Sequence, residues 1–156
     1  MKPVVAALAC LTLTACGGVP SGAPPAPTIT LSPGASSLTV RIDKVKSDRG
    51  PVFCDLFNAA DGFPGPSPII GGTVELDARD EPVCRWSGLP AGDYAVSVIQ
   101  DENANGSLDT NVLGVPLEGY GVSNNVVPST TAPRWSDARL TIDGTQSITI
   151  TVQLFN

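Results

Sequence analysis

The residues most suited to chemistry lie in one short run, DENANGSLDTN, at positions 101–111. Calcium takes six to eight hard oxygen ligands, and flexible loops rich in Asp and Asn supply them. The spacing matches the first nine positions of an EF-hand loop, with Gly106 at the sixth position, where the chain must turn sharply. The predicted oxygen ligands are Asp101, Asn103, Asn105, Asp109 and Ser107, the last through its backbone carbonyl.

Two departures separate this run from an EF-hand. The twelfth position, which should hold a bidentate Glu, is Val112, and no helical pattern flanks the run on either side. Glu118, Asn111 or Glu102 would have to complete the ligand shell. We therefore predict a calcium loop on a β scaffold, with an affinity in the weak extracellular range of roughly 10⁻⁴–10⁻³ M.

Two other interpretations of the run stay open. Asn105-Gly106 is a strong signal for a type I′ turn, and Asn and Asp side chains satisfy loop backbone groups without a metal. A glycosidase, in contrast, needs two carboxyl groups roughly 5–10 Å apart around a cleft. The candidates for such a pair are Asp101, Glu102, Asp109 and Glu118. The chain has 0 His, which excludes His-type zinc sites and Ser-His-Asp triads, and we expect no enzyme.

A second segment, VPLEGYGVSNN at positions 115–125, follows the loop directly. Its Pro and Gly residues are typical of a structural loop. An aromatic ring that stacks and amides that form hydrogen bonds also suit contact with a glycan or a peptide. The predicted ligand surface beside the loop consists of Tyr120, Asn124, Asn125 and Glu118.

The first residues predict export. Lys2 precedes the apolar run VVAALACLTLTA, which has the length of a signal peptide and is too short to span a membrane. The run ends in LTAC, which resembles a bacterial lipobox, so we predict a signal peptide over residues 1–15 and a lipid on the Cys16 thiol. An ordinary secretory signal is the alternative. By resemblance to lipoprotein sorting in two-membrane bacteria, Gly17 implies the outer membrane, facing the periplasm or the cell surface.

Composition separates a tether from a domain. Residues 16–37 are rich in Pro, Gly and Ser and predict a semi-extended tether, followed by one folded domain over residues 38–156. Loss of Lys2 with the signal reduces the nine basic side chains to eight, against 15 acidic ones, a formal net charge of −7. This charge argues against nucleic acid and anionic lipid surfaces as partners, since both need basic patches.

The four cysteines divide into two groups. Cys10 leaves with the signal and Cys16 carries the lipid, so Cys54 and Cys84 remain in the exported domain. Because export places them in an oxidising compartment, we predict a disulfide between them, with two buried free thiols as the alternative.

Alternation of apolar and polar residues with a period of two dominates the domain. Strands are predicted in residues 37–45, 51–58, 72–77, 82–89, 92–100, 138–143 and 147–155. Residues 92–100 are apolar on both faces, which favours a central strand. Turn signals predict that the first two strands, the third and fourth, and the last two form hairpins. No window has a sustained helical period, so the predicted fold is an all-β antiparallel sandwich of about seven strands, as in the immunoglobulin fold.

Several motifs carry a resemblance to known families. The turn and strand GLPAGDYAV, residues 88–96, resemble the same feature in transthyretin-like and collagen-adhesin B-type sandwich modules. The longer run 88–125 and APRWSDARLTI after it closely resemble the bacterial family catalogued as domain of unknown function 2141. All the family's motifs are present, with departures at Val122 and Trp135. The resemblance covers residues 38–155 and implies an exported β-sandwich, without an activity to carry over.

These features predict a non-enzymatic lipoprotein of the cell envelope that binds an envelope protein or a glycan, with calcium as its cofactor. The alternative is a purely structural envelope domain without ion or ligand, and a carbohydrate-active enzyme is a third reading.

Overall fold

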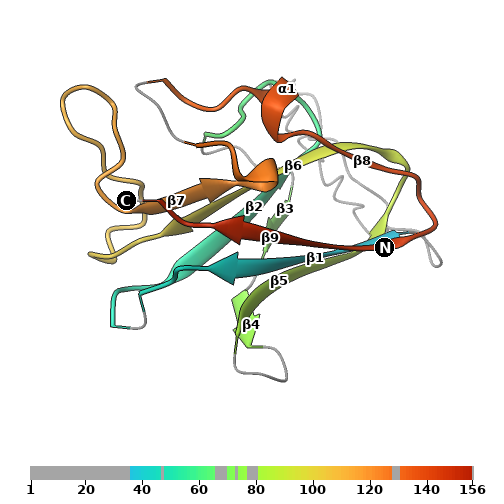
Figure 1. Cartoon of the computed structure of the whole chain (residues 1–156), viewed down its shortest axis with the longest axis horizontal. Helices are drawn as coiled ribbons and strands as arrows, with labels where there is room; N and C mark the ends of the chain where they lie inside the picture. The colour runs from blue at the N-terminus through green and yellow to red at the C-terminus, as the bar shows by residue number, and fades with distance from the viewer. Residues whose placement is uncertain are drawn as a thin grey trace, which may run out of the picture.

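The computed structural model describes residues 36–46, 48–65, 70–72, 74–76, 81–127 and 131–155. In these residues the chain forms two β-sheets in two layers, which confirms the predicted all-β sandwich (Figure 1). The predicted signal peptide, Cys16 and the tether up to residue 35 lie outside the described residues. The first strand begins at Ser36, so the last two residues of the predicted tether already belong to the fold.

The strands divide into sheets of four and five among the described residues. The first sheet has the order β4 (Val74–Leu76), β5 (Pro82–Leu89), β1 (Ser36–Asp43) and β9 (Ser147–Gln153). In the second, β3 (Ile70–Gly72), β2 (Val52–Phe57), β6 (Gly92–Gln100) and β7 (Gly119–Val122) lie in order, and β8 (Leu140–Ile142) pairs with the start of β6. The strands are therefore more numerous than the roughly seven predicted.

Two short helical elements accompany the sheets. They are a 3₁₀ turn, η1 (Ser123–Asn125), and the four-residue helix α1 (Trp135–Ala138), which contacts β6. Among the residues that the structure describes, no helix is long and apolar enough to cross a membrane.

Two of the three predicted hairpins are wrong. Strand β1 pairs antiparallel with β5 and parallel with β9, whereas β2 pairs with β3 and β6 in the other sheet. Strands β8 and β9 are split in the same way, because β8 pairs with β6. An apolar face with a period of two shows which side of a strand is buried, but not which of two facing sheets contains it. The third hairpin, β4 with β5, is confirmed.

The main core lies between the two sheets. It includes the predicted inward residues of β1 and β6, which are Leu38, Val40, Ile42, Tyr94, Val96 and Val98. The predicted disulfide is confirmed, and it joins Cys54 of β2 to Cys84 of β5, and so one sheet to the other. The two cysteines are 30 residues apart, and a crosslink of this span stabilises a fold by about 3–4 kcal/mol in the entropic model.

Strand β6 is buried on both faces, as predicted for a central strand. The face opposite the main core contributes Ala95 and Ile99 to a second apolar cluster on the outer side of the second sheet. Tyr120 and Val122 of β7 (Gly119–Val122) also belong to this cluster, and the segments that follow β2, β6 and η1 add Phe63, Leu108 and Trp135. These segments therefore form a partial third layer, and α1 lies within it (Figure 1).

Candidate functional site

The candidate site begins where the central strand ends. Asp101 follows β6 directly, and its side chain is only 1% exposed. Its carboxylate accepts hydrogen bonds from the backbone N–H groups of Asn105, at 3.1 Å, and Gly106, at 2.7 Å. Gly106 has a φ of +82°, the left-handed conformation that glycine adopts without strain. The sharp turn predicted at the sixth loop position is thus present.

The two asparagines link the turn to the second acid of the loop. Asn103 Oδ1 accepts from the N–H of Asn105 at 3.0 Å, and Asn105 Oδ1 accepts from the N–H of Ser107 at 2.8 Å. Their Nδ2 groups donate to the Asp109 carboxylate, at 2.6 Å from Asn103 and 3.1 Å from Asn105. The structure therefore brings the predicted loop residues together in one network, whose contacts are hydrogen bonds.

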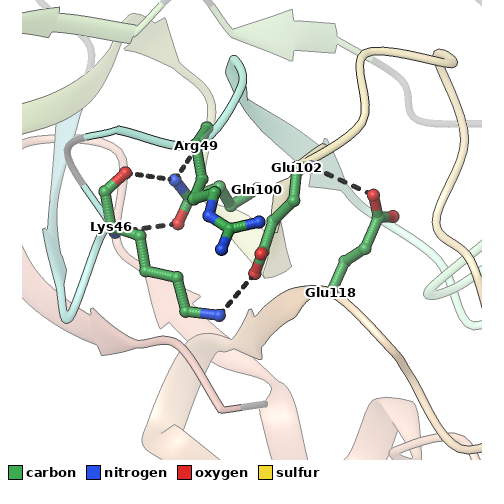
Figure 2. Close-up of polar contacts among 5 residues, drawn as sticks. All are labelled: Lys46, Arg49, Gln100, Glu102 and Glu118. Carbon is green, nitrogen blue, oxygen red and sulfur yellow. Dashed lines mark hydrogen bonds and ion pairs between the residues drawn. The ribbon is translucent and has the colours of Figure 1, made fainter.

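Glu118 closes this network from outside the loop. Its side chain is 4% exposed, and its Oε1 accepts from the N–H of Glu102 at 3.0 Å (Figure 2). Its Oε2 accepts from the N–H of Asp109 at 2.9 Å. The predicted approach of Glu118 to the loop is observed, but its oxygens contact backbone donors. Within the described ranges no group of three or more His, Cys, Asp or Glu side chains could hold a metal ion. A cation here would therefore depend on amide and carbonyl oxygens as well.

The base of the loop is held by the connection between β1 and β2. Gln100, at the end of β6, donates its side-chain amide to the carbonyl oxygens of Lys46, at 2.6 Å, and Arg49. Its Oε1 accepts from the Lys46 N–H at 3.0 Å (Figure 2). Lys46 Nζ also forms an ion pair with Glu102 at 2.7 Å. The loop is consequently anchored on both sides, by Gln100 below it and by Glu118 across it.

Gly50 in the same connection permits a close backbone approach. Its φ is +48°, and a Cβ at this position would lie 1.7 Å from the carbonyl oxygen of Asp101. The N–H of Asp101 in turn donates to the carbonyl of Pro51 at 2.9 Å. Only glycine is compatible with this packing of the connection against the start of the loop.

The residues predicted as a ligand surface make contacts within the fold. Tyr120 is 3% exposed in β7, where burial raises the pKa of its hydroxyl. Asn124 donates to the carbonyl oxygens of Asp137 and Arg139, and Asn125 bridges backbone groups of β9. Both asparagines have positive φ angles, of 63° and 51°, which Asn tolerates better than most residues. Their amides hold η1 against its neighbours, so the structure does not gather these three residues into an exposed surface.

A groove of about 500 Å³ opens on the outer face of the second sheet, beside the loop. Strand β2 contributes Phe53 and Asp55 to its lining, β6 contributes Ile99, and the loop contributes Asp101 and Leu108. Phe53 is 44% exposed, so part of its ring is open to the groove. Burial raises the pKa of the Asp55 carboxyl group, because its charged form loses hydration there.

The sequence did not single out this groove. The sequence pattern that could have revealed the groove lies in residues 52–57. One face of this strand carries Cys54 and Leu56, and the opposite face carries Phe53, Asp55 and Phe57. A face with two aromatic residues does not match the polar pattern of a solvated strand. It indicates a partly covered surface, and the covering segments come from distant parts of the chain.

Replacement of Glu118 by Ala is expected to release the loop. Two partly buried backbone N–H groups would lose their acceptor, which costs about 1–3 kcal/mol in the free energy of unfolding. Urea denaturation measures this loss, and hydrogen exchange should accelerate at the amides of Glu102 and Asp109. The matched control is Glu75→Ala, which removes an exposed acid 3.8 Å from Arg85 and should change stability by less than about 0.5 kcal/mol. Unchanged exchange at both amides would contradict the bracing role.

Comparison with known proteins identifies the family. The model of a family described as an uncharacterised protein conserved in bacteria, DUF2141, matches residues 40–150. No curated protein matches the chain, and no solved structure does. The matched residues contain the strands β2 to β8, the disulfide and the whole polar loop. With more than half of its length matched and its motifs folded into one β-sandwich, the chain belongs to the DUF2141 family.

Proposed function

We propose that this protein is a non-enzymatic binding module of the bacterial cell envelope, whose ligand occupies the groove beside the 101–109 loop. The observation that carries the proposal is the groove itself, of about 500 Å³, with apolar walls from Phe53, Ile99 and Leu108 and a half-buried carboxyl group from Asp55. Small-molecule sites have volumes of about 300–1,000 Å³ and combine mostly apolar walls with a few polar groups.

The engagement of the loop acids supports binding rather than catalysis. Asp101 uses both carboxylate oxygens to accept backbone N–H groups, and Glu118 does the same. A general acid or base must exchange protons with a substrate, and these two groups are committed to holding the chain. The rival glycosidase reading would need a second free carboxyl group next to Asp55.

A screen of small fragments by amide NMR tests this function. We expect the fragments that bind to shift the amide signals of Phe53, Ile99 and Leu108 together. Phe53→Ala should weaken the binding of these fragments. The control is Val112→Ala, which shortens a fully exposed side chain of the loop and should leave the hits unchanged. Shifts without a common location, or detectable turnover of envelope glycans, would refute a non-enzymatic binding groove.

We propose calcium as a second ligand, held by the loop. The supporting observation is that Asp101, Asn103, Asn105 and Asp109 already lie in one network. To ligate an ion, the two Asn amides would have to present Oδ1 where Nδ2 now contacts Asp109. This change would break the bonds from the N–H groups of Asn105 and Ser107. The exchange costs free energy, so the affinity should be weak.

Calorimetry with calcium chloride checks this ligand. We expect a Kd of roughly 10⁻⁴–10⁻³ M, and at about 10 mM calcium a stabilisation of about 1–3 kcal/mol, seen as a higher Tm. Asp109→Asn, which keeps the side-chain size but removes the charge, should weaken binding, and Asp101→Ala/Asp109→Ala should abolish it. The absence of heat and of a Tm shift in the parent protein would leave the loop as a metal-free turn.

We also propose that a lipid on Cys16 anchors the protein in the outer membrane, after removal of residues 1–15. Several acyl chains give lasting anchorage, because each buried methylene contributes about 0.8 kcal/mol. Cells of a two-membrane bacterium fed with a clickable fatty acid should label the parent protein. Labelling should disappear in Cys16→Ser and persist in Cys10→Ser, the control inside the signal. An unlabelled parent would indicate an ordinary secretory signal.

A further inference from the structure

The groove contains an acid without a partner. Asp55 lies on the outer face of β2, directly opposite Ser97 of β6 on one side and Gly71 of β3 on the other. Neither neighbour carries a charge. In the part of the chain that the structure describes, no hydrogen bond or ion pair reaches the Asp55 carboxylate, although this group is half-buried. A half-buried carboxylate without a donor is costly, and a bound cation would relieve that cost.

A second polar group beside Asp55 is also unsatisfied. Ser97 is 1% exposed, and its hydroxyl has no hydrogen-bond partner among the described residues. The cross-strand register places Ser97 and Asp55 next to each other on the same face of the sheet. Buried polar groups in native proteins are usually paired, so the unpaired Ser97 hydroxyl beside the half-buried Asp55 carboxylate indicates a place for a ligand's donors.

The walls around this polar spot are apolar. The next cross-strand pair on the same face of the sheet is Phe53 with Ile99, and Leu108 and Pro64 add to the apolar lining. The lining that the structure describes also contains a second acid, Asp101, and no basic side chain. This combination opposes anions and favours a cation attached to an apolar body. The exposed ring of Phe53 adds a surface on which a cation or a methylene stem can pack.

From these observations, and building on the proposed binding function, we propose that the groove binds a primary ammonium group on an apolar stem, with Asp55 as its counter-ion. An ammonium group supplies both the missing charge and three donors, enough for the Asp55 carboxylate and the Ser97 hydroxyl oxygen. A neutral hydroxyl supplies one donor and no charge. The stem then packs on Phe53, Ile99 and Leu108. A free alkylamine and the lysine side chain of a peptide share this chemistry.

Matched probes distinguish charge from apolar contact. n-Hexylamine, n-hexanol and hexanoate each contain six carbon atoms and differ in charge, and acetyl-Gly-Lys-Gly-amide presents the same ammonium group on a peptide. Titration by amide NMR at pH 7 should show the amine, the peptide or both binding the full chain, with shifts at Phe53 and Ile99. Hexanol should bind at least tenfold more weakly than the better cation, and hexanoate should not bind. The cation that binds more tightly identifies the source of the ammonium group, which is either a free amine or a lysine side chain.

Asp55→Asn tests the counter-ion directly. This substitution should lower the affinity for the tighter-binding cation at least tenfold. Asp61→Asn, which changes an exposed acid in the segment after β2, should leave the affinity unchanged. The Asn variant is expected to fold, because it replaces a half-buried charge by a neutral side chain of the same shape. Equal binding of hexanol and hexylamine, or unchanged affinity in Asp55→Asn, would overturn the assignment. If neutral fragments occupy the groove and neither cation binds, this inference fails and the proposed binding function stands; if nothing binds there, both fail.

Discussion

The conformation of the loop at residues 101–111 depends on a carboxylate that is buried where the central strand, β6, ends. Asp101 is almost inaccessible to water, and a buried carboxylate needs hydrogen-bond donors. The donors closest in sequence are the N–H groups of the residues that follow, so the chain turns back on itself at Gly106. Glu118 repeats this solution across the loop. Two buried acids thus impose one conformation on a segment that has little apolar core of its own.

The same constraint shapes the groove. Because the loop folds back, Leu108 reaches the outer face of the second sheet and joins the apolar cluster there. Phe63 and Trp135, whose rings meet edge to face at a centroid distance of 5.7 Å, cover another part of this face. The covered parts leave the surface around Phe53 and Asp55 partly open. The groove is therefore the remainder of a sheet face that distant segments cover incompletely.

Much of this was predictable from local patterns. Alternation predicted the inward faces of β1 and β6, and the count of cysteines, together with the prediction of export, predicted the Cys54–Cys84 disulfide. The Asn-Gly spacing located the turn. Pairing across the sandwich was not predictable, because the choice of sheet for β2 and β8 depends on contacts between distant residues. Asp55 was missed for the same reason: an acid on the outer face of a strand is normally solvated, and only the tertiary cover makes it half-buried.

The loop and the groove share residues, and this limits what a single substitution can reveal. Asp101 holds the loop through its carboxylate and also lines the groove, while Leu108 lies between two loop residues and packs in the outer cluster. Loss of the Asp101 carboxylate would therefore disturb Leu108 and weaken a groove ligand even if no ion ever bound the loop. Asp109 and Asp55 separate the two sites better, because Asp109 is not among the described lining residues and, in the described part of the chain, no hydrogen bond joins Asp55 to the loop network. An effect of calcium on the groove would then have to be judged by whether it survives in Asp109→Asn, where the charge of the loop is reduced and the anchoring carboxylates of Asp101 and Glu118 stay in place.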